Sequence, residues 1–424
     1  MLEDKSLFWE EYRRLDKEFN THKDTSYEYL VNFSQTRNEP IHRWFYYQEG
    51  YSPQLVINIL NYLQMNNKNI FVLDPFAGSG TTLLVAKQMG MKSLGFEINP
   101  FSAFMIKAKT RNYNAKELKQ ILSFKPALKE ISDPYSKYKL KIIKNLFDKE
   151  KLEEIEALKE EINKIKNDKV RNVLFAGLLS IIEDVSNYRK GGNGLKKKRI
   201  KKNIAPIEAF SNKISQIYED LEKAKNGPEP IIINDSCLNL SNYPEIKNID
   251  VSIFSPPYAN CFDPFEVYKM ELWVGEFVSS YSELKEKRKA ALTSNLNANL
   301  NKDIKNIHRT SLLNKIIDYL YHCNLWDKRI IKMLDRYFYD MYIVLNSLYE
   351  KTSVGGYCVI VVGNSAYGNL AIPTDILLAQ LGKKAGFKVK EIIVARRNET
   401  SSQQQSKLGN FVEYLRESIV VLKK

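Results

Sequence analysis

Short apolar runs and helical patterns alternate in two parts of the chain. In the first part, an apolar run at residues 70–73 leads into a glycine-rich loop, a helical pattern covers 81–90, and the pattern of a second strand covers 92–99. A strand, a loop, a helix and a strand in that order form a βαβ unit of roughly 30 residues. The same alternation returns at 229–262 and 351–424. The pattern predicts the α/β class, with one open, mostly parallel sheet.

Two long segments carry the spacing of helices instead. Residues 113–228 and 263–350 have apolar side chains three or four positions apart between alternating charges. This spacing is typical of amphipathic helices. We therefore expect one domain formed by 1–112, 229–262 and 351–424, with two largely helical insertions between its parts.

The charge balance adds a candidate partner. The 424 residues include 64 Lys and Arg against 50 Asp and Glu, a net charge of +14. Such an excess suits a protein that holds a nucleic-acid backbone, although a lysine-rich composition without that role stays open. Residues 188–202 hold eight of these cations and three glycines, which predicts a flexible basic loop; a merely solvated loop is the alternative. Its candidate phosphate contacts are Arg189, Lys190, Lys196, Lys197, Lys198 and Arg199.

The cysteine spacing and the hydropathy of the chain indicate the cellular compartment in which the protein works. The four cysteines show no CxxC or CxxH spacing, so we expect neither a metal site nor a disulfide framework. The first residues are charged, without the apolar core of a signal peptide. No apolar run approaches the roughly 20 residues that span a bilayer. These patterns predict a cytoplasmic protein with no membrane partner.

A glycine-rich loop follows the first predicted strand and opens the next helix. Glycines let backbone N–H groups approach a ligand closely, and a helix N-terminus favours a polar group. The next predicted strand ends in an acid, which in this place grips ribose hydroxyls. The spacing of neither a P-loop nor a dinucleotide fingerprint is present, since Leu83 replaces the third glycine of the latter. S-adenosylmethionine, which has a ribose but no pyrophosphate, fits this pattern. The candidate residues are Asp74, Pro75, Phe76, Ala77, Gly78, Ser79, Gly80, Thr81, Glu97, Ile98 and Asn99.

A second motif, Ser255-Pro256-Pro257-Tyr258, follows a later apolar strand. Consecutive prolines fix the backbone and leave carbonyl oxygens as free acceptors at a strand end, where α/β sheets bind ligands. We expect a planar base whose NH₂ donates to the Ser255 oxygen and the Pro256 carbonyl, with the Tyr258 ring stacked on it. A rigid turn with a core tyrosine is the alternative.

Together the motifs DPFAGSGTT, FEINP and SPPY resemble the amino-methyltransferases of bacterial restriction–modification systems, and the serine-led tetrad is similar to their cytosine-N4 branch. The resemblance covers the α/β portions, and it implies a Rossmann-like methyltransferase fold that binds S-adenosylmethionine. It further implies that Asp235, with Ser236, lies near the cofactor's adenine, and that Tyr51 and Ser52 lie beside its methionine end. Gly363-Asn364 resembles a motif that shapes the base pocket.

The resemblance also implies the reaction. A base would be flipped out of double-stranded DNA, and the N4 amino group of cytosine would take the methyl group without a metal. The first insertion, 113–228, is a candidate target-recognition region and the second, 263–350, a candidate DNA-binding region. A separate cognate restriction endonuclease is a candidate partner.

Three other functions stay open. Adenine-N6 methylation of DNA uses the same fold and tetrad position. Ser255 in the first tetrad position and the lack of a recognisable RNA-binding domain count against a guanine-N2 methyltransferase acting on RNA. The intact motifs count against a DNA-binding protein without activity.

Overall fold

The computed structural model describes residues 5–140, 142–192, 194–199, 204–398 and 406–424. An eight-stranded sheet forms its centre, in the order β1-β11-β12-β8-β7-β2-β3-β6. All neighbouring strands are parallel except where β12 runs against both β11 and β8. The open, mostly parallel α/β sheet is therefore confirmed. The strands are β1 (Thr21–Lys23), β2 (Phe71–Asp74), β3 (Lys92–Phe96), β6 (Ile231–Ile233), β7 (Ile249–Phe254), β8 (Thr352–Gly363), β11 (Lys388–Arg397) and β12 (Arg416–Lys423).

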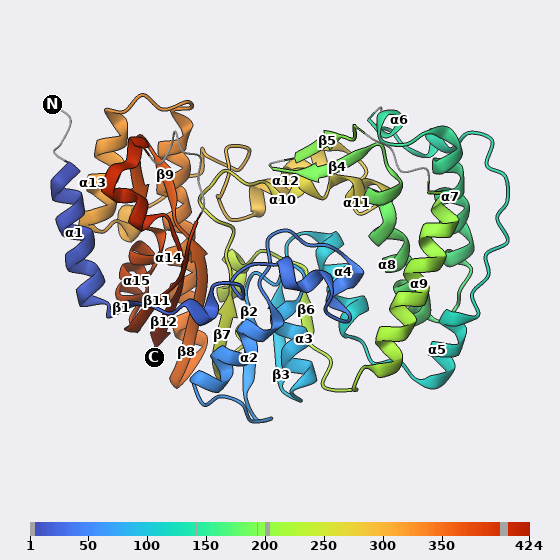
Figure 1. The fold of residues 1–424 in the computed structure, drawn as a ribbon, viewed down its shortest axis with the longest axis horizontal. Coiled ribbons are helices and arrows are strands. Elements are labelled where there is room, and N and C mark those ends of the chain that lie inside the picture. The colour runs from blue at the N-terminus through green and yellow to red at the C-terminus, as the bar shows by residue number, and fades with distance from the viewer. Residues whose placement is uncertain (1–4, 141, 193, 200–203, 399–405) are drawn as a thin grey trace.

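Helices cover both faces of this sheet (Figure 1). Strand β8 shows why, because its apolar side chains alternate between the two faces and are buried on both. Val359 and Val361 pack with α2 (Pro53–Tyr62) and α3 (Thr81–Gln88). Cys358, Ile360 and Val362 pack on the opposite side with α1 (Lys5–Glu18), α13 (Ser311–Tyr321), α14 (Arg329–Lys351) and α15 (Thr374–Ala385). A continuous apolar run thus marks a strand enclosed between two helical layers.

Local side-chain hydrogen bonds set the starts of two helices. The Ser52 side chain accepts a hydrogen bond from the Gln54 N–H, and Pro53 occupies the first turn of α2. Asn99 caps α4 (Pro100–Thr110) in the same manner, accepting from the N–H groups of Phe101 and Ser102. Both caps lie directly beside segments that the sequence marks as functional, so the caps also fix where those segments leave the sheet.

The first insertion forms a helical lobe with a core of its own, packed on α4 and on α11 (Lys269–Val274). It contains α5 (Ala115–Leu122), α6 (Ile143–Leu146), α7 (Lys149–Asn163), α8 (Asp168–Val185) and α9 (Pro206–Lys223). The flexible loop expected over residues 188–202 is wrong for the part that the structure describes. That part pairs as an antiparallel hairpin, β4 (Tyr188–Gly191) with β5 (Gly194–Lys197), because the glycines serve the turn rather than a disordered segment. Lys201 and Lys202 lie outside the described residues.

The second insertion is divided between two places. Its first helices, α10 (Pro264–Val267), α11 (Lys269–Val274) and α12 (Tyr281–Ala290), lie toward the helical lobe, above the sheet (Figure 1). Helix α14 instead packs on the sheet and on α15 as part of the main core. Strands β9 (Ser365–Tyr367) and β10 (Leu370–Ile372) form a small hairpin after β8.

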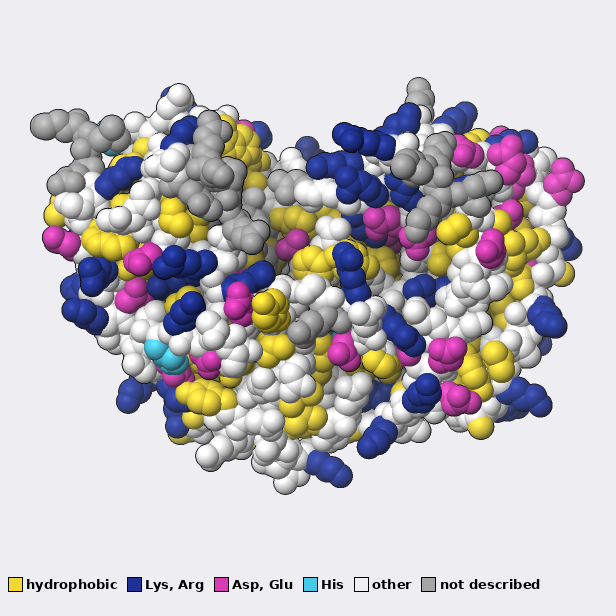
Figure 2. Space-filling view, viewed as in Figure 1, with side chains coloured by type: hydrophobic (Ala, Val, Ile, Leu, Met, Phe, Trp, Pro, Cys, Tyr) yellow, Lys and Arg dark blue, Asp and Glu magenta, His cyan; other side chains and the backbone are white. Residues whose placement is uncertain are grey.

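The molecule is hollowed between its two ends. Figure 2 shows a depression at the top, between the α1–α13 end and the helical lobe. Lys and Arg side chains gather on the rim of this depression over β4, β5 and α12. None of the helices in the described ranges has the length and apolar character needed to cross a membrane.

Candidate functional site

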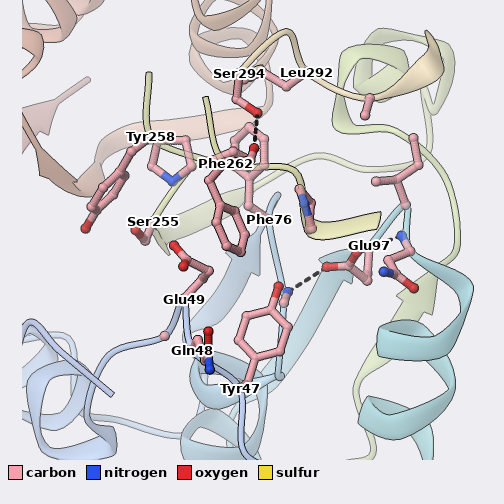
Figure 3. A pocket seen from close by; sticks show the side chains of 18 of the residues that line it. Tyr47, Gln48, Glu49, Phe76, Glu97, Ser255, Tyr258, Phe262, Leu292 and Ser294 are labelled. Carbon is pink, nitrogen blue, oxygen red and sulfur yellow. Dashed lines mark hydrogen bonds between the residues drawn. The ribbon is translucent and has the colours of Figure 1, made fainter. Parts of the chain in front are cut away.

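The site lies where the strand order of the sheet reverses. The chain passes from β2 outward to β3 and β6 on one side, and from β7 to β8 on the other. The loops after β2 and β7 therefore leave the sheet in a shared crevice, which is where open α/β sheets bind ligands. A cavity of about 310 Å³ occupies this place, a size suited to a small cofactor or base. Figure 3 shows it from close by.

The glycine-rich loop bends sharply at two positions. Gly78 and Gly80 have φ of +52° and +80°, a backbone conformation that residues other than glycine rarely adopt. A Cβ on Gly80 would lie 2.9 Å from the Ile106 side chain, so only glycine lets α4 approach the loop. The Gly78 N–H donates to Glu97 Oε2 at 2.7 Å, which joins the loop to the end of β3. The loop is thus held in one shape across the crevice.

Glu97 is a buried carboxylate on the cavity wall. Burial raises the pKa of Glu97 to about 7, and the N–H groups of Asn99 and Gly78 oppose that rise. The Asn99 N–H donates to Oε1 at 2.7 Å. Each oxygen keeps a lone pair for a further donor. The two hydroxyl groups of a vicinal diol could each donate a hydrogen bond to one of these oxygens.

Asp235 follows β6 on the same wall. Its Oδ1 accepts from the Ser236 N–H at 2.7 Å, and its Oδ2 accepts from the Tyr243 hydroxyl at 2.9 Å. The Asn239 amide donates to both oxygens. The carboxylate is therefore oriented before any ligand arrives. Phe76, Phe96 and Ile98 supply apolar surface beside it.

The tetrad Ser255-Pro256-Pro257-Tyr258 lines the other half of the cavity. The Tyr258 hydroxyl donates to Glu417 Oε1 at 2.6 Å, and Glu417 is paired with Arg396. Burial, followed by the charge of Glu417, raises the pKa of Tyr258. Gly363 leaves room for the ring, because a Cβ there would lie 2.8 Å from Tyr258 Cε2. The ring is thus anchored at its hydroxyl and closely packed on its edge.

Twelve of the expected site residues line this one cavity. From the loops after β2 and β3 come Pro75, Phe76, Gly78, Glu97, Ile98 and Asn99, and from those after β6 and β7 come Asp235, Ser236, Ser255, Pro256, Pro257 and Tyr258. Residues separated by 180 positions in the chain thus meet, because parallel strands end at the same edge of a sheet.

Other expected residues lie beneath the cavity rather than on its wall. The Tyr51 hydroxyl lies against Thr82 and within 3.4 Å of Asp74, under the glycine loop. Ser52 caps α2. Asp74 accepts from the Phe76 N–H at 3.0 Å, and burial raises the pKa of Asp74 to about 7. Ala77, Ser79, Gly80 and Thr81 complete the loop and the first turn of α3 without lining the cavity. Gly363 touches Tyr258, whereas Asn364 bonds Asp375 and the Tyr414 carbonyl.

Sequence reasoning missed the wall contributed by residues 47–49. The Tyr47 ring stacks on Tyr268 with centroids 5.0 Å apart, and it covers Gly78. The Glu49 side chain points into the cavity on the side of Ser255 (Figure 3). Both residues belong to the segment FYYQEGYSPQLV, in which the resemblance implies cofactor contacts at Tyr51 and Ser52 only. The available signal was an acid and two tyrosines directly before a capped helix.

The basic hairpin separates into buried and exposed cations. The expected phosphate contact of Lys190 is wrong, because its side chain is buried and pairs with Glu271 and with Glu183. A lysine enclosed in this way is not available to a phosphate. Lys198 donates to the carbonyls of Glu183, Asp184 and Ser186 at the end of α8. Four side chains remain exposed on this surface, namely Arg189, Lys196, Lys197 and Arg199.

Metal-binding chemistry has no support in the part of the chain that the structure describes. There, no group of three or more His, Cys, Asp or Glu side chains is placed to hold an ion. The four cysteines are free thiols. The polar groups on the cavity wall are carboxylates, amides, hydroxyls and backbone groups.

The sheet order, the glycine loop joined to Glu97 and the strand-end cavity define a Rossmann-like methyltransferase. Residues 7–109 match the family model N6_N4_Mtase, described as DNA methylase. Over 93% of the chain it is 28% identical to the type II methyltransferase M.BsoBI of Geobacillus stearothermophilus, of which 88% is covered. The type II methyltransferase M.AvaI of a Nostoc species is 26% identical, over 89% of the chain and 85% of that protein. M.MvaI of Kocuria varians, also a type II methyltransferase, is 24% identical over 97% of the chain and 96% of that protein. This similarity over most of the chain confirms the resemblance to the methyltransferases of restriction–modification systems.

Proposed function

We propose that this protein transfers a methyl group from S-adenosylmethionine to the N4 amino group of a flipped cytosine in double-stranded DNA. The observation that carries the proposal is the presence of the serine-led tetrad and the Glu97–Gly78 loop on one cavity. The family model covers both N6 and N4 enzymes, so the choice of cytosine rests on Ser255.

The cavity residues fit S-adenosylmethionine. Glu97 would accept from both ribose hydroxyls, and Asp235 would accept from the adenine amino group while Phe76 and Ile98 enclose the ring. The Asn99 side-chain N–H₂ is buried and has no hydrogen-bond partner among the described residues, so it is available to a ligand acceptor. When bound, the cofactor supplies a methyl group already activated on a sulfonium, which needs no metal.

The tetrad would hold the base. The amino group would donate one hydrogen to the Ser255 hydroxyl and one to the Pro256 carbonyl, which holds its nitrogen lone pair toward the methyl group. The Tyr258 ring, fixed by Glu417, would stack on the base. Positioning and local electrostatics then supply most of the rate enhancement.

The exposed cations suit the DNA backbone. Arg189, Lys196, Lys197 and Arg199 are exposed and lie in or directly after the β4–β5 hairpin, the region over which Lys and Arg side chains gather at the rim of the depression in Figure 2. We propose that phosphates lie along this rim and that the helical lobe, residues 113–228, contributes to target recognition. In the second insertion the proposed DNA-binding part is limited to the segment before α13, because α14 belongs to the main core.

Nucleoside analysis tests the function. The purified protein is incubated with methyl-labelled S-adenosylmethionine and plasmid DNA, and the nucleosides are separated by mass spectrometry. Label in N4-methylcytosine supports the proposal, and Ser255→Ala should lose most of it. Label in N6-methyladenine would refute the choice of base while keeping the site. Label in RNA alone would refute DNA as the substrate.

A further inference from the structure

Glu49 is a carboxylate in the cavity without an evident structural role. Its side chain has no hydrogen-bond or ion-pair partner among the described residues, and Figure 3 shows it on the side of Ser255. Solvent reaches it through the cavity, although protein atoms surround it closely. Structural carboxylates of this site, such as Asp235 and Glu417, are each bonded to several donors. Glu49 is therefore placed for a ligand rather than for the fold.

The backbone on the N-terminal side of Glu49 is held in place. The Tyr47 ring is stacked on Tyr268, and the Gln48 N–H donates to the Tyr268 hydroxyl at 3.1 Å. On the other side, the Ser52 N–H donates to the Leu30 carbonyl at 2.8 Å. A side chain carried between fixed points meets a ligand without the cost of ordering a loop.

The tetrad by itself lacks a proton acceptor. Ser255 is a neutral hydroxyl and the Pro256 carbonyl is a very weak base, yet the amino nitrogen must lose a proton once it carries the methyl group. A carboxylate beside Ser255 supplies that missing group. We propose, on the basis of the function proposed above, that Glu49 receives the proton of the methylated amino group through the hydroxyl of Ser255.

Methyl transfer and proton transfer are coupled in this relay. The amino nitrogen lone pair forms the bond to the methyl carbon, and the pair of the broken carbon–sulfur bond stays on sulfur. One N–H proton then passes to Ser255 Oγ while the Ser255 hydroxyl proton passes to the Glu49 carboxylate. The base leaves as a neutral methylamine, and Glu49 returns its proton to water through the cavity. The relay applies to cytosine and adenine alike, because both present an amino group.

The surroundings of Glu49 determine when it is ionised. Solvent reaches part of the Glu49 side chain, but the protein atoms that crowd it, followed by the negative charge of Glu417 on β12, raise its pKa to about 7. The other ionisable side chains that face it are Arg396 of β11, which is paired with Glu417, and the tyrosines Tyr47, Tyr258 and Tyr268. The Glu49 carboxylate is thus a proton acceptor above neutral pH and is protonated below it.

Single-turnover rates between about pH 6 and 8 test the relay. Enzyme in excess, loaded with S-adenosylmethionine, is mixed with labelled DNA in three forms: wild type, Glu49→Gln, and the control Glu39→Gln, whose exposed carboxylate lies in the same segment outside the cavity. The wild-type and Glu39→Gln rates should fall up to tenfold per pH unit below about 7. The Glu49→Gln rate should be about 100-fold lower at pH 8 and independent of pH.

A measurement on the protein without substrate complements the kinetics. Infrared difference spectra across pH 7 should contain a carboxyl band that is absent in Glu49→Gln and present in Glu39→Gln. Cofactor affinity, measured by calorimetry, should be equal in the three proteins, which shows that the site is folded.

Several outcomes would overturn the relay. A Glu49→Gln protein with the wild-type rate and pH profile would do so, as would a wild-type rate that falls when pH rises through 7, since that would make protonated Glu49 the active form. An infrared difference spectrum of Glu49→Gln that equals the wild-type spectrum would also overturn the relay. In each case, methylated DNA from the wild type leaves the proposed function standing. A wild type that labels no DNA overturns both.

Discussion

Replacing Gly363 with Ala would displace the ring that we propose stacks on the base. The new Cβ would lie 2.8 Å from Tyr258 Cε2 and 3.1 Å from Cδ2. Ordinary carbon contacts are about 3.5–4.0 Å apart, so the ring or the strand must give way by roughly 0.7 Å or more. The Tyr258 hydroxyl is held by Glu417, so the ring cannot swing aside without losing that hydrogen bond.

The magnitude follows from the geometry. A displacement of about 1 Å in a reacting group costs on the order of 100-fold in rate, so Gly363→Ala should lower the single-turnover rate about 10- to 100-fold. This corresponds to about 1.4–2.7 kcal/mol of barrier. Affinity for S-adenosylmethionine should stay within about twofold, because the residues near the proposed cofactor end, such as Glu97 and Asp235, do not touch Gly363.

The assay compares rates and cofactor binding in three proteins. The wild type and Gly363→Ala are measured beside Val354→Ala, which changes an exposed side chain on the same strand. Thermal unfolding shows whether Gly363→Ala remains folded. A folded Gly363→Ala protein with the wild-type rate would refute the reasoning, since the ring would then have no required position.

Two further predictions follow from buried charges. Lys190→Ala leaves Glu271 buried without its cation, so the free energy of unfolding measured with denaturant should fall by about 3–5 kcal/mol. Lys196 is exposed, so Lys196→Ala should change the free energy of unfolding by no more than about 0.5 kcal/mol and should reduce the salt dependence (log–log slope) of DNA binding by about one. The reverse ranking in stability would contradict the burial of Lys190. Asp74 has a pKa of about 7 in the folded protein against an ordinary 3.8; the folded state therefore binds more protons, and stability should fall as pH rises from about 4 to 7. In Asp74→Asn this part of the slope should vanish, as denaturant unfolding across that range would show, and an unchanged slope would contradict the assignment.

Much of the site was readable because its signals are local. The run from Asp74 to Thr81 and the tetrad each combine a strand end with residues of unusual backbone preference, glycine in one and proline in the other. Backbone requirements of this kind depend on few neighbours, so the sequence carries them. The same holds for the caps at Ser52 and Asn99.

The errors arose where long-range burial decides the role of a residue. Lys190 stands in a run of cations that any count of charge assigns to the surface, yet Glu271, 81 positions later, encloses it. Helix α14 has the pattern of an insertion helix but packs on the sheet. Glu49 has no motif of its own, and the stacking of Tyr47 on Tyr268 from a distant segment directs it into the cavity.

The amino-acid sequence by itself determined the class of sheet, the glycine loop, the tetrad and their order along the chain, because strand patterns, turns and caps are set by residues within a few positions of one another. Only the tertiary structure decided which of these residues meet on one cavity, which cations stay exposed and which carboxylate faces Ser255. These outcomes depend on contacts between segments far apart in the chain, such as Lys190 and Glu271 at 81 positions, and packing of the whole core selects them.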